Sequence, residues 1–201
     1  MLVVGLNGSP KKDGNTAFLV QEGLVSAKAA GAETDLINVS EVLSDCKIPY
    51  CNVCSNPCVG ACSRNNRLGE AYDLLRRADA LLIGSPVYFG TVSAQLKAFW
   101  DKARFLRKEK ALLNVVGAGV TVGASRFGGQ ETALKAIFDM MLVQGMTIVG
   151  DGFIDADCGH QGVCSQAPAA NDDFAIKRVR IIGQRLAEVA GATMELRKHR
   201  G

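Results

Sequence analysis

The chain has 201 residues, of which 48% are hydrophobic and 21% are charged, and it contains 22 glycines. This composition is typical of a globular protein with a buried core, and it excludes disordered and collagen-like chains. The formal net charge of +3, from 23 basic and 20 acidic residues, is too small and too dispersed to favour nucleic-acid binding.

No part of the sequence is suited to crossing a membrane. The longest apolar runs, 2–6 and 111–116, are far shorter than the roughly 20 residues that span a bilayer. The first residues carry neither a basic leader nor a small-residue cleavage site, so we expect a cytoplasmic protein. Repeats and dividing linkers are absent from the sequence, and we expect one domain over residues 1–201.

Short apolar runs alternate with amphipathic segments along the chain. The apolar runs predict strands buried on both faces over 2–6, 34–39, 80–83, 111–118 and 146–149. Helical spacing of apolar residues predicts helices over 16–30, 68–78, 92–103, 130–144 and 172–190. The polar, glycine-rich stretch 150–171 is assigned no strand or helix. This alternation predicts an α/β fold, a doubly wound five-stranded parallel sheet of order 2-1-3-4-5.

The loop of residues 8–16 joins the first strand to the first helix. Backbone N–H groups and the positive end of a helix dipole attract an anion at such a junction. Ser9, Asn15 and Thr16 add donors, and Lys11 adds a charge. The loop matches neither the P-loop nor the Gly-x-Gly-x-x-Gly pattern, so it favours a monophosphate over a pyrophosphate. A plain polar turn capped by Asn15 or Thr16 is the alternative.

Residues 85–91 follow the third strand, beside the point where the strand order 2-1-3-4-5 reverses. The loops after the first and third strands therefore open onto one crevice. Tyr88, Phe89 and the rigid Pro86 are suited to lining a flat heteroaromatic ring, although packing alone is the alternative for the aromatic pair. The glycine-rich loop 117–130 is placed to cover the same ring.

Three segments carry a family resemblance: GSPxxxGNT at 8–16, GSPVYFGTVSAQLK at 84–97 and GGQET at 128–132. They resemble signatures of the NADPH-dependent FMN reductase and iron–sulfur flavoprotein branch of the flavodoxin-like superfamily, and the resemblance covers most of residues 1–150. It implies an FMN site whose contacts are, for the phosphate, Ser9, Lys11, Asn15 and Thr16 and, for the isoalloxazine, Pro86, Val87, Tyr88, Phe89 and Gly90. The last segment is similar to that of quinone reductases, which implies that Gly123 and Gly128 approach the flavin.

Five of the seven cysteines lie within residues 46–62, after the second predicted strand. Cys51, Cys54, Cys58 and Cys62 offer four thiolates in twelve residues, with Cys46 five residues earlier. In a reducing compartment such clustering indicates metal binding more often than disulfides, and four thiolates are what most iron–sulfur clusters use. Because iron–sulfur flavoproteins carry their cluster motif at this place, the resemblance implies an iron–sulfur cluster, 4Fe-4S, on these four residues.

The cysteine spacing leaves alternatives open. The family motif has two residues between each of its first three cysteines and a longer gap before the fourth, whereas here the second and third gaps are three residues each. Cys46 is therefore an alternative ligand, and a four-cysteine zinc site, unligated thiols or a redox disulfide are alternatives to a cluster. Cys158 and Cys164 are interpreted as free thiols, with a second metal loop, a regulatory pair or a subunit contact as alternatives.

These features predict an FMN-dependent oxidoreductase that moves electrons between a ferredoxin-like donor, an iron–sulfur cluster, FMN and an acceptor such as oxygen, peroxide or a quinone. The alternatives are an NAD(P)H-dependent FMN or quinone reductase with zinc or free cysteines, and a non-enzymatic electron shuttle or zinc-stiffened binding module. No acid–base residue is assigned, because FMN supplies the chemistry and His160 and His199 lie outside the crevice loops. The resemblance also implies a homo-oligomer, a dimer or tetramer, in which a neighbouring subunit covers the flavin.

Overall fold

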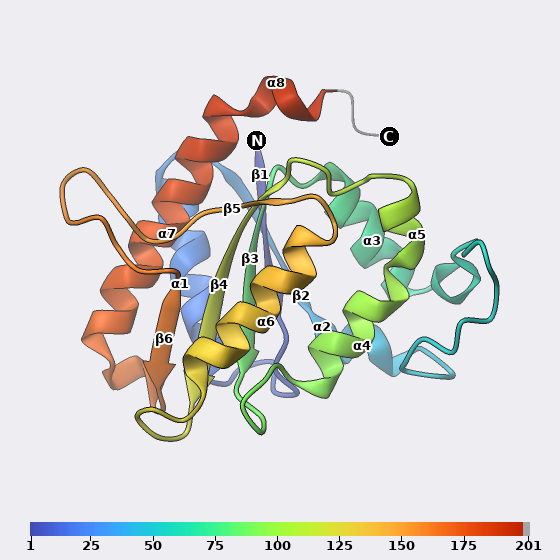
Figure 1. Cartoon of the computed structure of the whole chain (residues 1–201), viewed down its shortest axis with the longest axis horizontal. Helices are drawn as coiled ribbons and strands as arrows, with labels where there is room; N and C mark the ends of the chain where they lie inside the picture. Colours follow the sequence, from blue (N-terminus) through green and yellow to red (C-terminus); the bar gives the residue numbers. More distant parts are fainter. Residues whose placement is uncertain (199–201) are drawn as a thin grey trace.

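In the computed structural model of the chain (Figure 1), the described residues are 1–198, so His199 lies outside them. One sheet runs in the order β2-β1-β3-β4-β5, with β6 also paired to β4. Its strands are β1 Leu2–Asn7, β2 Glu33–Asn38, β3 Ala80–Pro86, β4 Val116–Gly123, β5 Thr147–Ile148 and β6 Val163–Gln166. This order confirms the predicted order 2-1-3-4-5. The pairings between these strands are all parallel, as predicted.

Helices cover both faces of this sheet. They are α1 Asn15–Ala29, α2 Val39–Ser44, α3 Arg67–Arg77, α4 Ala94–Lys102, α5 Arg104–Lys108, α6 Gln130–Leu142, α7 Asp173–Ala192 and α8 Met194–Arg197, with short 3-10 turns at Ala61–Ser63 and Ala169–Asn171. Figure 1 shows α1 and α7 on one face and α2 to α6 on the other. The described residues contain no helix with the length and apolarity that a membrane crossing requires.

Alternation along the strands divides the core into two layers. Val3 and Leu82 pack among residues of α1 and α7, whereas Val4 and Ile83 pack among residues of α2 to α6. Successive side chains of a strand point to opposite faces, so a strand covered by helices on both sides must be apolar throughout. The continuous apolar runs in the sequence therefore identified the central strands correctly.

Glycines on β4 bring α6 close to the sheet. A Cβ atom on Gly117 would lie 2.3 Å from the sulfur of Met141, and one on Gly119 would lie 2.5 Å from Leu134 Cδ1. Real Cβ atoms do not approach other heavy atoms this closely, so side chains of α6 occupy the space above these glycines. The helix can thus lie directly on β4, whose next residues lead into the candidate site.

The far edge of the sheet differs from the prediction. Its fifth position is split: β5 pairs with Val116 and Gly117, whereas β6 pairs with residues 120–123 of the same strand. The chain between β5 and β6 leaves the sheet as a loop and then returns to the same edge of β4 (Figure 1). No strand was predicted within 150–171, because the four residues of β6 are hidden in a polar, glycine-rich context.

The fourth strand also begins later than predicted. Residues 111–114 form turns, and β4 begins at Val116. Ala111 and Leu112 are nevertheless fully buried, since they pack beneath the α2 to α6 layer. A short apolar run does not distinguish a strand from a buried turn, which explains the error.

Candidate functional site

The amino end of α1 is open to an anion. The N-cap residue is Gly14, which has no side chain to cap the helix, and no acidic residue lies in the first turn. Thr16, in the first turn of the helix, is 2% exposed. The first N–H groups of a helix lack partners within the helix and carry its positive dipole end. The junction therefore offers several free donors to a phosphate group.

Ser9 and Lys11 lie within a compact turn before that helix. The backbone N–H of Ser9 donates to Asn7 Oδ1 at 3.1 Å, and Ser9 Oγ accepts from the backbone N–H of Lys11 at 3.1 Å. Asn7 in turn donates to the carbonyl oxygen of Lys11 at 3.0 Å. Ser9 is buried while Lys11 is exposed. The turn is thus held by its own side chains, and the hydroxyl proton of Ser9 remains available to a ligand.

Two serines join the first loop to the third-strand loop. Ser93 Oγ donates to the carbonyl oxygen of Gly8, and the backbone N–H of Ser93 donates to Ser85 Oγ at 3.0 Å. The backbone N–H of Gly8 donates to Gly84 O at 2.8 Å, at a place where a Cβ on Gly8 would lie 2.7 Å from that oxygen. These contacts place the two predicted cofactor loops side by side.

The third-strand loop ends in a tight turn that meets the fourth-strand loop. The backbone N–H of Tyr88 donates to the carbonyl oxygen of Thr91 at 3.0 Å, and the N–H of Thr91 donates to that of Tyr88 at 3.1 Å. Phe89 and Gly90, between them, have positive φ. A Cβ on Gly129 would lie 3.0 Å from the Cα of Gly90. The loops after β1, β3 and β4 therefore converge at one edge of the sheet, as the switch-point argument requires.

The predicted ring contacts differ in exposure. Pro86, Val87 and Gly90 are half-buried, whereas Tyr88 is 45% exposed and Phe89 is fully exposed at the tip of the turn. Phe127, in the adjoining loop, is 90% exposed. Exposed large aromatic side chains on soluble proteins mark surfaces that contact a ligand or another chain.

Three predicted contacts are partly engaged within the protein. Asn15 Oδ1 accepts from the backbone N–H of Ala169 at 2.9 Å, which leaves its amide nitrogen as the available donor. A Cβ on Gly123 would lie 2.4 Å from Gln130 Nε2, so the Gln130 side chain covers this glycine. A Cβ on Gly128 would lie 2.8 Å from Ser125 O, within the same loop. Both glycines thus serve the packing of the β4–α6 loop.

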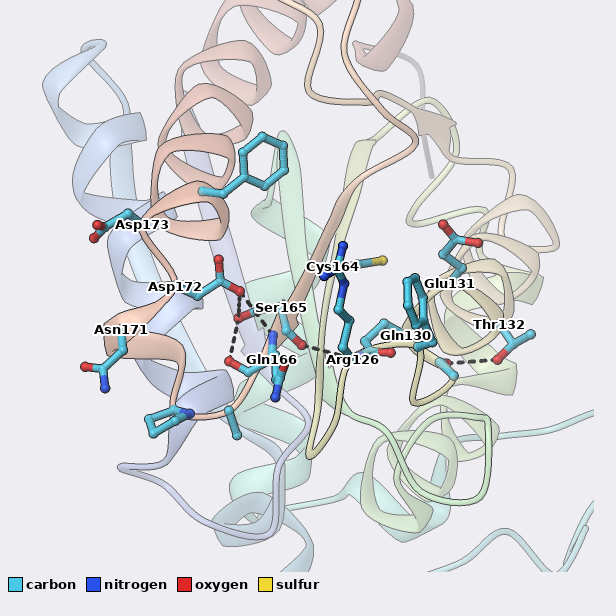
Figure 2. A pocket seen from close by; sticks show the side chains of 15 residues that line it. Arg126, Gln130, Glu131, Thr132, Cys164, Ser165, Gln166, Asn171, Asp172 and Asp173 are labelled. Carbon is cyan, nitrogen blue, oxygen red and sulfur yellow. Dashed lines mark hydrogen bonds between the residues drawn. The ribbon is translucent and has the colours of Figure 1, made fainter.

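A cleft of about 990 Å³ lies next to this crevice, between the β4–α6 loop and the β6–α7 connection (Figure 2). Arg126, Gln130 and Glu131 line one side, and Cys164 and Asp172 line the other. None of the predicted FMN contacts is among its lining residues. The sequence did not indicate this cleft, because the strand that forms its floor, β6, was not predicted.

The cysteine segment packs against α3, α4 and α5. Cys46, Cys58 and Cys62 are partly buried against the core of this layer, whereas Cys54 is exposed. Gly60 has φ +66°, and a Cβ there would lie 3.2 Å from the ring of Phe105. Asn66 caps α3 and donates to the carbonyl oxygen of Cys62 at 2.9 Å. The segment is therefore anchored at its carboxyl end.

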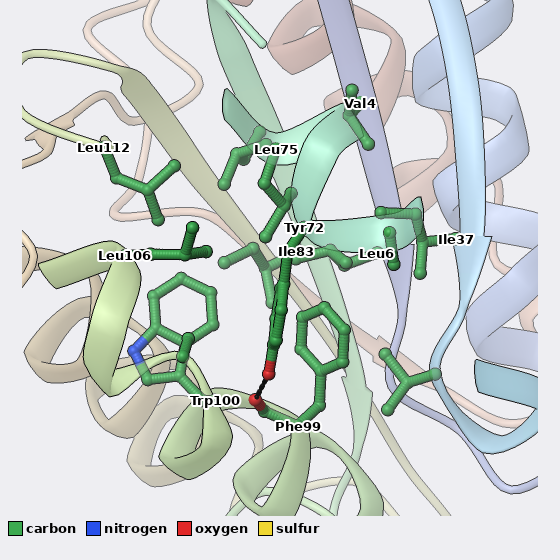
Figure 3. Packing of buried hydrophobic residues seen from close by; sticks show 14 of the residues in the cluster. Val4, Leu6, Ile37, Tyr72, Leu75, Ile83, Phe99, Trp100, Leu106 and Leu112 are labelled. Carbon is green, nitrogen blue, oxygen red and sulfur yellow. Dashed lines mark hydrogen bonds between the residues drawn. The ribbon is translucent and has the colours of Figure 1, made fainter. Parts of the chain in front are cut away.

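Tyr72 marks the place where the cysteines gather. It is fully buried beside Phe99, and its hydroxyl donates to the Phe99 carbonyl oxygen at 2.7 Å (Figure 3). Burial raises the pKa of Tyr72 well above its usual value, and the thiols of Cys62, Cys46, Cys51 and Cys58 add to the rise. Four of the five clustered cysteines are thus near one buried hydroxyl group.

All seven cysteines are free thiols. Within residues 1–198, no three His, Cys, Asp or Glu side chains form a group that could hold a metal ion. The donors gathered in the cysteine segment are nevertheless all sulfur, which is the chemistry that iron–sulfur clusters and four-cysteine zinc sites require. The donor set therefore fits both groups.

Comparison with known proteins assigns the family. Residues 1–161 match the family described as NADPH-dependent FMN reductase. The chain belongs to this family. It is 41% identical to an iron–sulfur flavoprotein of Methanocaldococcus jannaschii, over 94% of this chain and 97% of that protein. It is 36% identical to an iron–sulfur flavoprotein of Methanosarcina thermophila, over 94% of this chain and 95% of that protein.

The structural comparison agrees with the fold. A flavodoxin, the WrbA-like protein of Agrobacterium tumefaciens, superimposes with a TM-score of 0.65 at 21% identity, covering 95% of this chain and 96% of that one. The fold is thus flavodoxin-like, and family membership makes the protein an FMN-dependent oxidoreductase. The amino end of α1, which has no acidic residue in its first turn and carries the hydroxyl of Thr16, fits a phosphate-bearing flavin.

Thr16→Val tests the phosphate contact. The two side chains are nearly equal in shape, so the change removes a hydroxyl from the open end of α1. A hydrogen bond to a charged group contributes about 1.5–3 kcal/mol, so we expect the FMN dissociation constant to rise roughly 10- to 100-fold. Flavin fluorescence titration measures this constant. Thr147→Val, an exposed position on β5, is the control, and equal affinities in both variants would contradict the assignment.

Sequence reasoning missed Ser85, Ser93, Gln130 and the Ala169 contact with Asn15. Ser93 is the N-cap of α4, and a serine before a helical pattern is a signal that could have located that end of the helix. Its bond to Gly8 depends on parallel strands that are distant in sequence. The short strand β6 brings Ala169 to α1, and no local pattern indicates that approach.

Proposed function

We propose that this protein is an iron–sulfur flavoprotein that moves electrons between a small redox protein of the ferredoxin type, a cluster held by the cysteine segment, FMN and a small acceptor such as oxygen, peroxide or a quinone. The observation that carries the proposal is that five free cysteines lie in one segment, four of them near Tyr72, in a chain that belongs to an FMN-reductase family. The names of its relatives in Methanocaldococcus jannaschii and Methanosarcina thermophila support it.

The cofactors have separate places in the chain. The crevice loops would bind FMN, with Ser9, Lys11, Asn15 and Thr16 at the phosphate. The residues that would hold a 4Fe-4S cluster are Cys51, Cys54, Cys58 and Cys62, with Cys46 as the possible substitute. When bound, FMN exchanges one or two electrons and the cluster exchanges one.

Helix α4 links these two places. Ser93 at its amino end bonds to Gly8 in the crevice, and the helix runs over nine residues to Lys102. A helix of this length spans about 14 Å, at about 1.5 Å per residue. At its far end Trp100 and Asp101 line a small cavity together with Cys51. One rigid element therefore connects the flavin loops with the cysteine segment.

The alternative is an NAD(P)H-dependent FMN or quinone reductase whose cysteines hold zinc or remain free. The NADPH-dependent description of the matched family favours it. Nicotinamide would then reach the flavin from the open side of the crevice, where Tyr88 and Phe89 are exposed. Metal analysis distinguishes the two functions, because only the first requires iron.

We also infer a homo-oligomer, a dimer or tetramer, working in the cytoplasm. Phe89 and Phe127 project from adjoining loops and are almost fully exposed. A neighbouring subunit that covered them would also shield a flavin in the crevice from water. Light scattering of the wild-type protein and of a Phe89→Ser, Phe127→Ser double variant tests this, and an unchanged mass would contradict the role of these rings.

Cysteine replacement tests the proposed cluster. Cys54→Ala is expected to remove the visible iron–sulfur absorbance while FMN stays bound, because a four-thiolate site loses a ligand that no histidine or carboxylate replaces. Cys46→Ala is expected to retain iron. Cys158→Ala, an exposed cysteine outside the segment, is the matched control. Iron content in Cys54→Ala equal to that of the control would contradict the ligand assignment.

A further inference from the structure

A second cavity lies at the outer edge of the sheet, between α6 and α7, where β5 ends. Its volume is about 570 Å³. Its walls come from Phe138 of α6, Ile148 of β5, the loop of residues 150–161 and Arg185 of α7. None of the proposed FMN contacts and none of the clustered cysteines is among its lining residues. The cavity is therefore separate from both proposed cofactor sites.

Arg185 brings a positive charge to this cavity. Its Nε atom is buried, yet none of the described residues accepts a hydrogen bond from it. No Asp or Glu is among the residues that line the cavity. Arg178, seven residues earlier on the same face of α7, differs in this respect, because its guanidinium donates to Asp151 and Asp157.

The free Nε indicates the charge of the missing partner. A buried N–H group without an acceptor is costly, and in native proteins such a group is commonly explained by a bound water or ion. The guanidinium of Arg185 keeps its positive charge in proteins. A ligand that satisfies it is therefore expected to be an anion.

One wall of the cavity is closely packed backbone. The N–H of Asp151 donates to the carbonyl oxygen of His160 at 3.2 Å. A Cβ on Gly150 would lie 2.3 Å from that oxygen, and one on Gly152 would lie 2.5 Å from the carbonyl oxygen of Cys158. Side chains at these two glycines would force the loop apart. The cavity is therefore preformed, as binding sites for small molecules usually are.

The lining residues indicate which kind of anion fits. A guanidinium is planar and pairs through two N–H groups with the oxygens of a carboxylate or a phosphate. Phe138 and Ile148 are half-buried and give the cavity an apolar side. Its volume lies within the range of small-molecule sites, which is about 300–1,000 Å³. A small molecule with an oxyanion at one end and an apolar body matches these walls.

We propose that this cavity is a binding site for a small organic anion, whose oxyanion pairs with Arg185 and whose apolar body packs against Phe138 and Ile148. The site goes beyond the proposed function, because it shares no residue with the flavin crevice or the cysteine segment. Cys158 lines the same cavity and is exposed. Its thiol can therefore report what the cavity attracts.

The first test measures binding of benzoate and of phenyl phosphate to the full chain with its cofactors, by isothermal titration calorimetry. A hydrogen bond to a charged group supports an expected rise of roughly 10- to 100-fold in the dissociation constant in Arg185→Met. The tighter of the two probes identifies the oxyanion as carboxylate or phosphate. Arg180→Met, which removes an exposed charge from the same helix, is the control and should bind as wild type does. Failure of both probes to bind wild type, or equal affinity in Arg185→Met, would overturn the proposal.

The second test compares alkylation of Cys158 by iodoacetate, a carboxylate, and by the neutral iodoacetamide, followed by peptide mass spectrometry. In both reactions the thiolate sulfur displaces iodide, so the ratio of the two rates isolates the effect of the reagent's charge. Loss of one nearby unit charge supports an expected fall of about fivefold in this ratio in Arg185→Met. The ratio in Arg180→Met should equal that of wild type. An unchanged ratio in Arg185→Met would count against an anion site.

A measurement on wild type alone covers the case in which Arg185→Met does not fold. Benzoate or phenyl phosphate bound in the cavity should slow the alkylation of Cys158 by iodoacetamide. Protection by either probe supports the site. Alkylation at the same rate with and without both probes would overturn it.

Discussion

Arg178→Met is expected to lower the free energy of unfolding by about 3–5 kcal/mol, because it leaves a buried carboxylate without its partner. Asp151 is fully buried, and Arg178 is 3% exposed. The guanidinium donates to Asp151 through Nε, to the Asp151 carbonyl oxygen at 2.8 Å, and to Asp157 at 3.0 and 3.1 Å. Urea denaturation measures the difference in unfolding free energy.

Arg180→Met is the matched control. Arg180 lies on the same helix and pairs with Glu22 at 2.7 Å, but its side chain is 60% exposed. Exposed pairs contribute about 0–1 kcal/mol, so the control should lose at most that much. Similar losses in the two variants would show that the Asp151–Arg178 contact does not hold the 149–162 segment to α7.

The contact between Asp151 and Arg178 also predicts that the stability of the protein falls in acid. Burial opposes ionisation of Asp151, but the hydrogen bonds from Arg178 and from the His160 backbone outweigh it and lower the pKa of Asp151. A carboxyl group with a lowered pKa contributes stability above its ordinary pKa, and this contribution disappears as the pH falls through the lowered value. The difference between wild type and Arg178→Met should therefore shrink below about pH 4. A difference that is constant from pH 7 to pH 3 would contradict this.

Gly183→Ala is expected to destabilise the protein by about 1–3 kcal/mol through overpacking. Helices α1 and α7 meet at two glycines, and a Cβ on Gly183 would lie 2.0 Å from the carbonyl oxygen of Gly23. That atom is backbone, so the helices would have to separate. Thermal unfolding measures the loss.

Gly191→Ala, on the same helix, is expected to stabilise the protein instead. A Cβ there meets nothing within 4 Å, and alanine favours a helix over glycine by up to about 1 kcal/mol. The pair of variants therefore separates helix propensity from close packing. Stabilisation by both substitutions would show that α1 and α7 are farther apart than the structure places them.

The central fold was predictable because its signals are local and repeated. Residues 2–6 and 80–83 are continuous apolar runs, and they form strands covered by helices on both faces. The stripe of Leu96, Phe99 and Trp100 identified α4, although the helix, capped by Ser93, begins two residues later than the predicted residue 92. The order 2-1-3-4-5 followed from this alternation.

The parts that escaped prediction depend on contacts between distant residues. The four residues of β6 form a strand because β4 offers an edge, and the segment before them is held by the Arg178 contacts. The burial of Lys102 could not be read from the sequence either, since lysines are usually exposed.

The most direct measurement is the cofactor content of the protein purified without oxygen: a visible spectrum together with FMN, iron, sulfide and zinc per chain. The account predicts one FMN with about four irons and four sulfides. FMN without iron, or zinc in place of iron, would contradict an iron–sulfur flavoprotein and favour the NAD(P)H-dependent reductase.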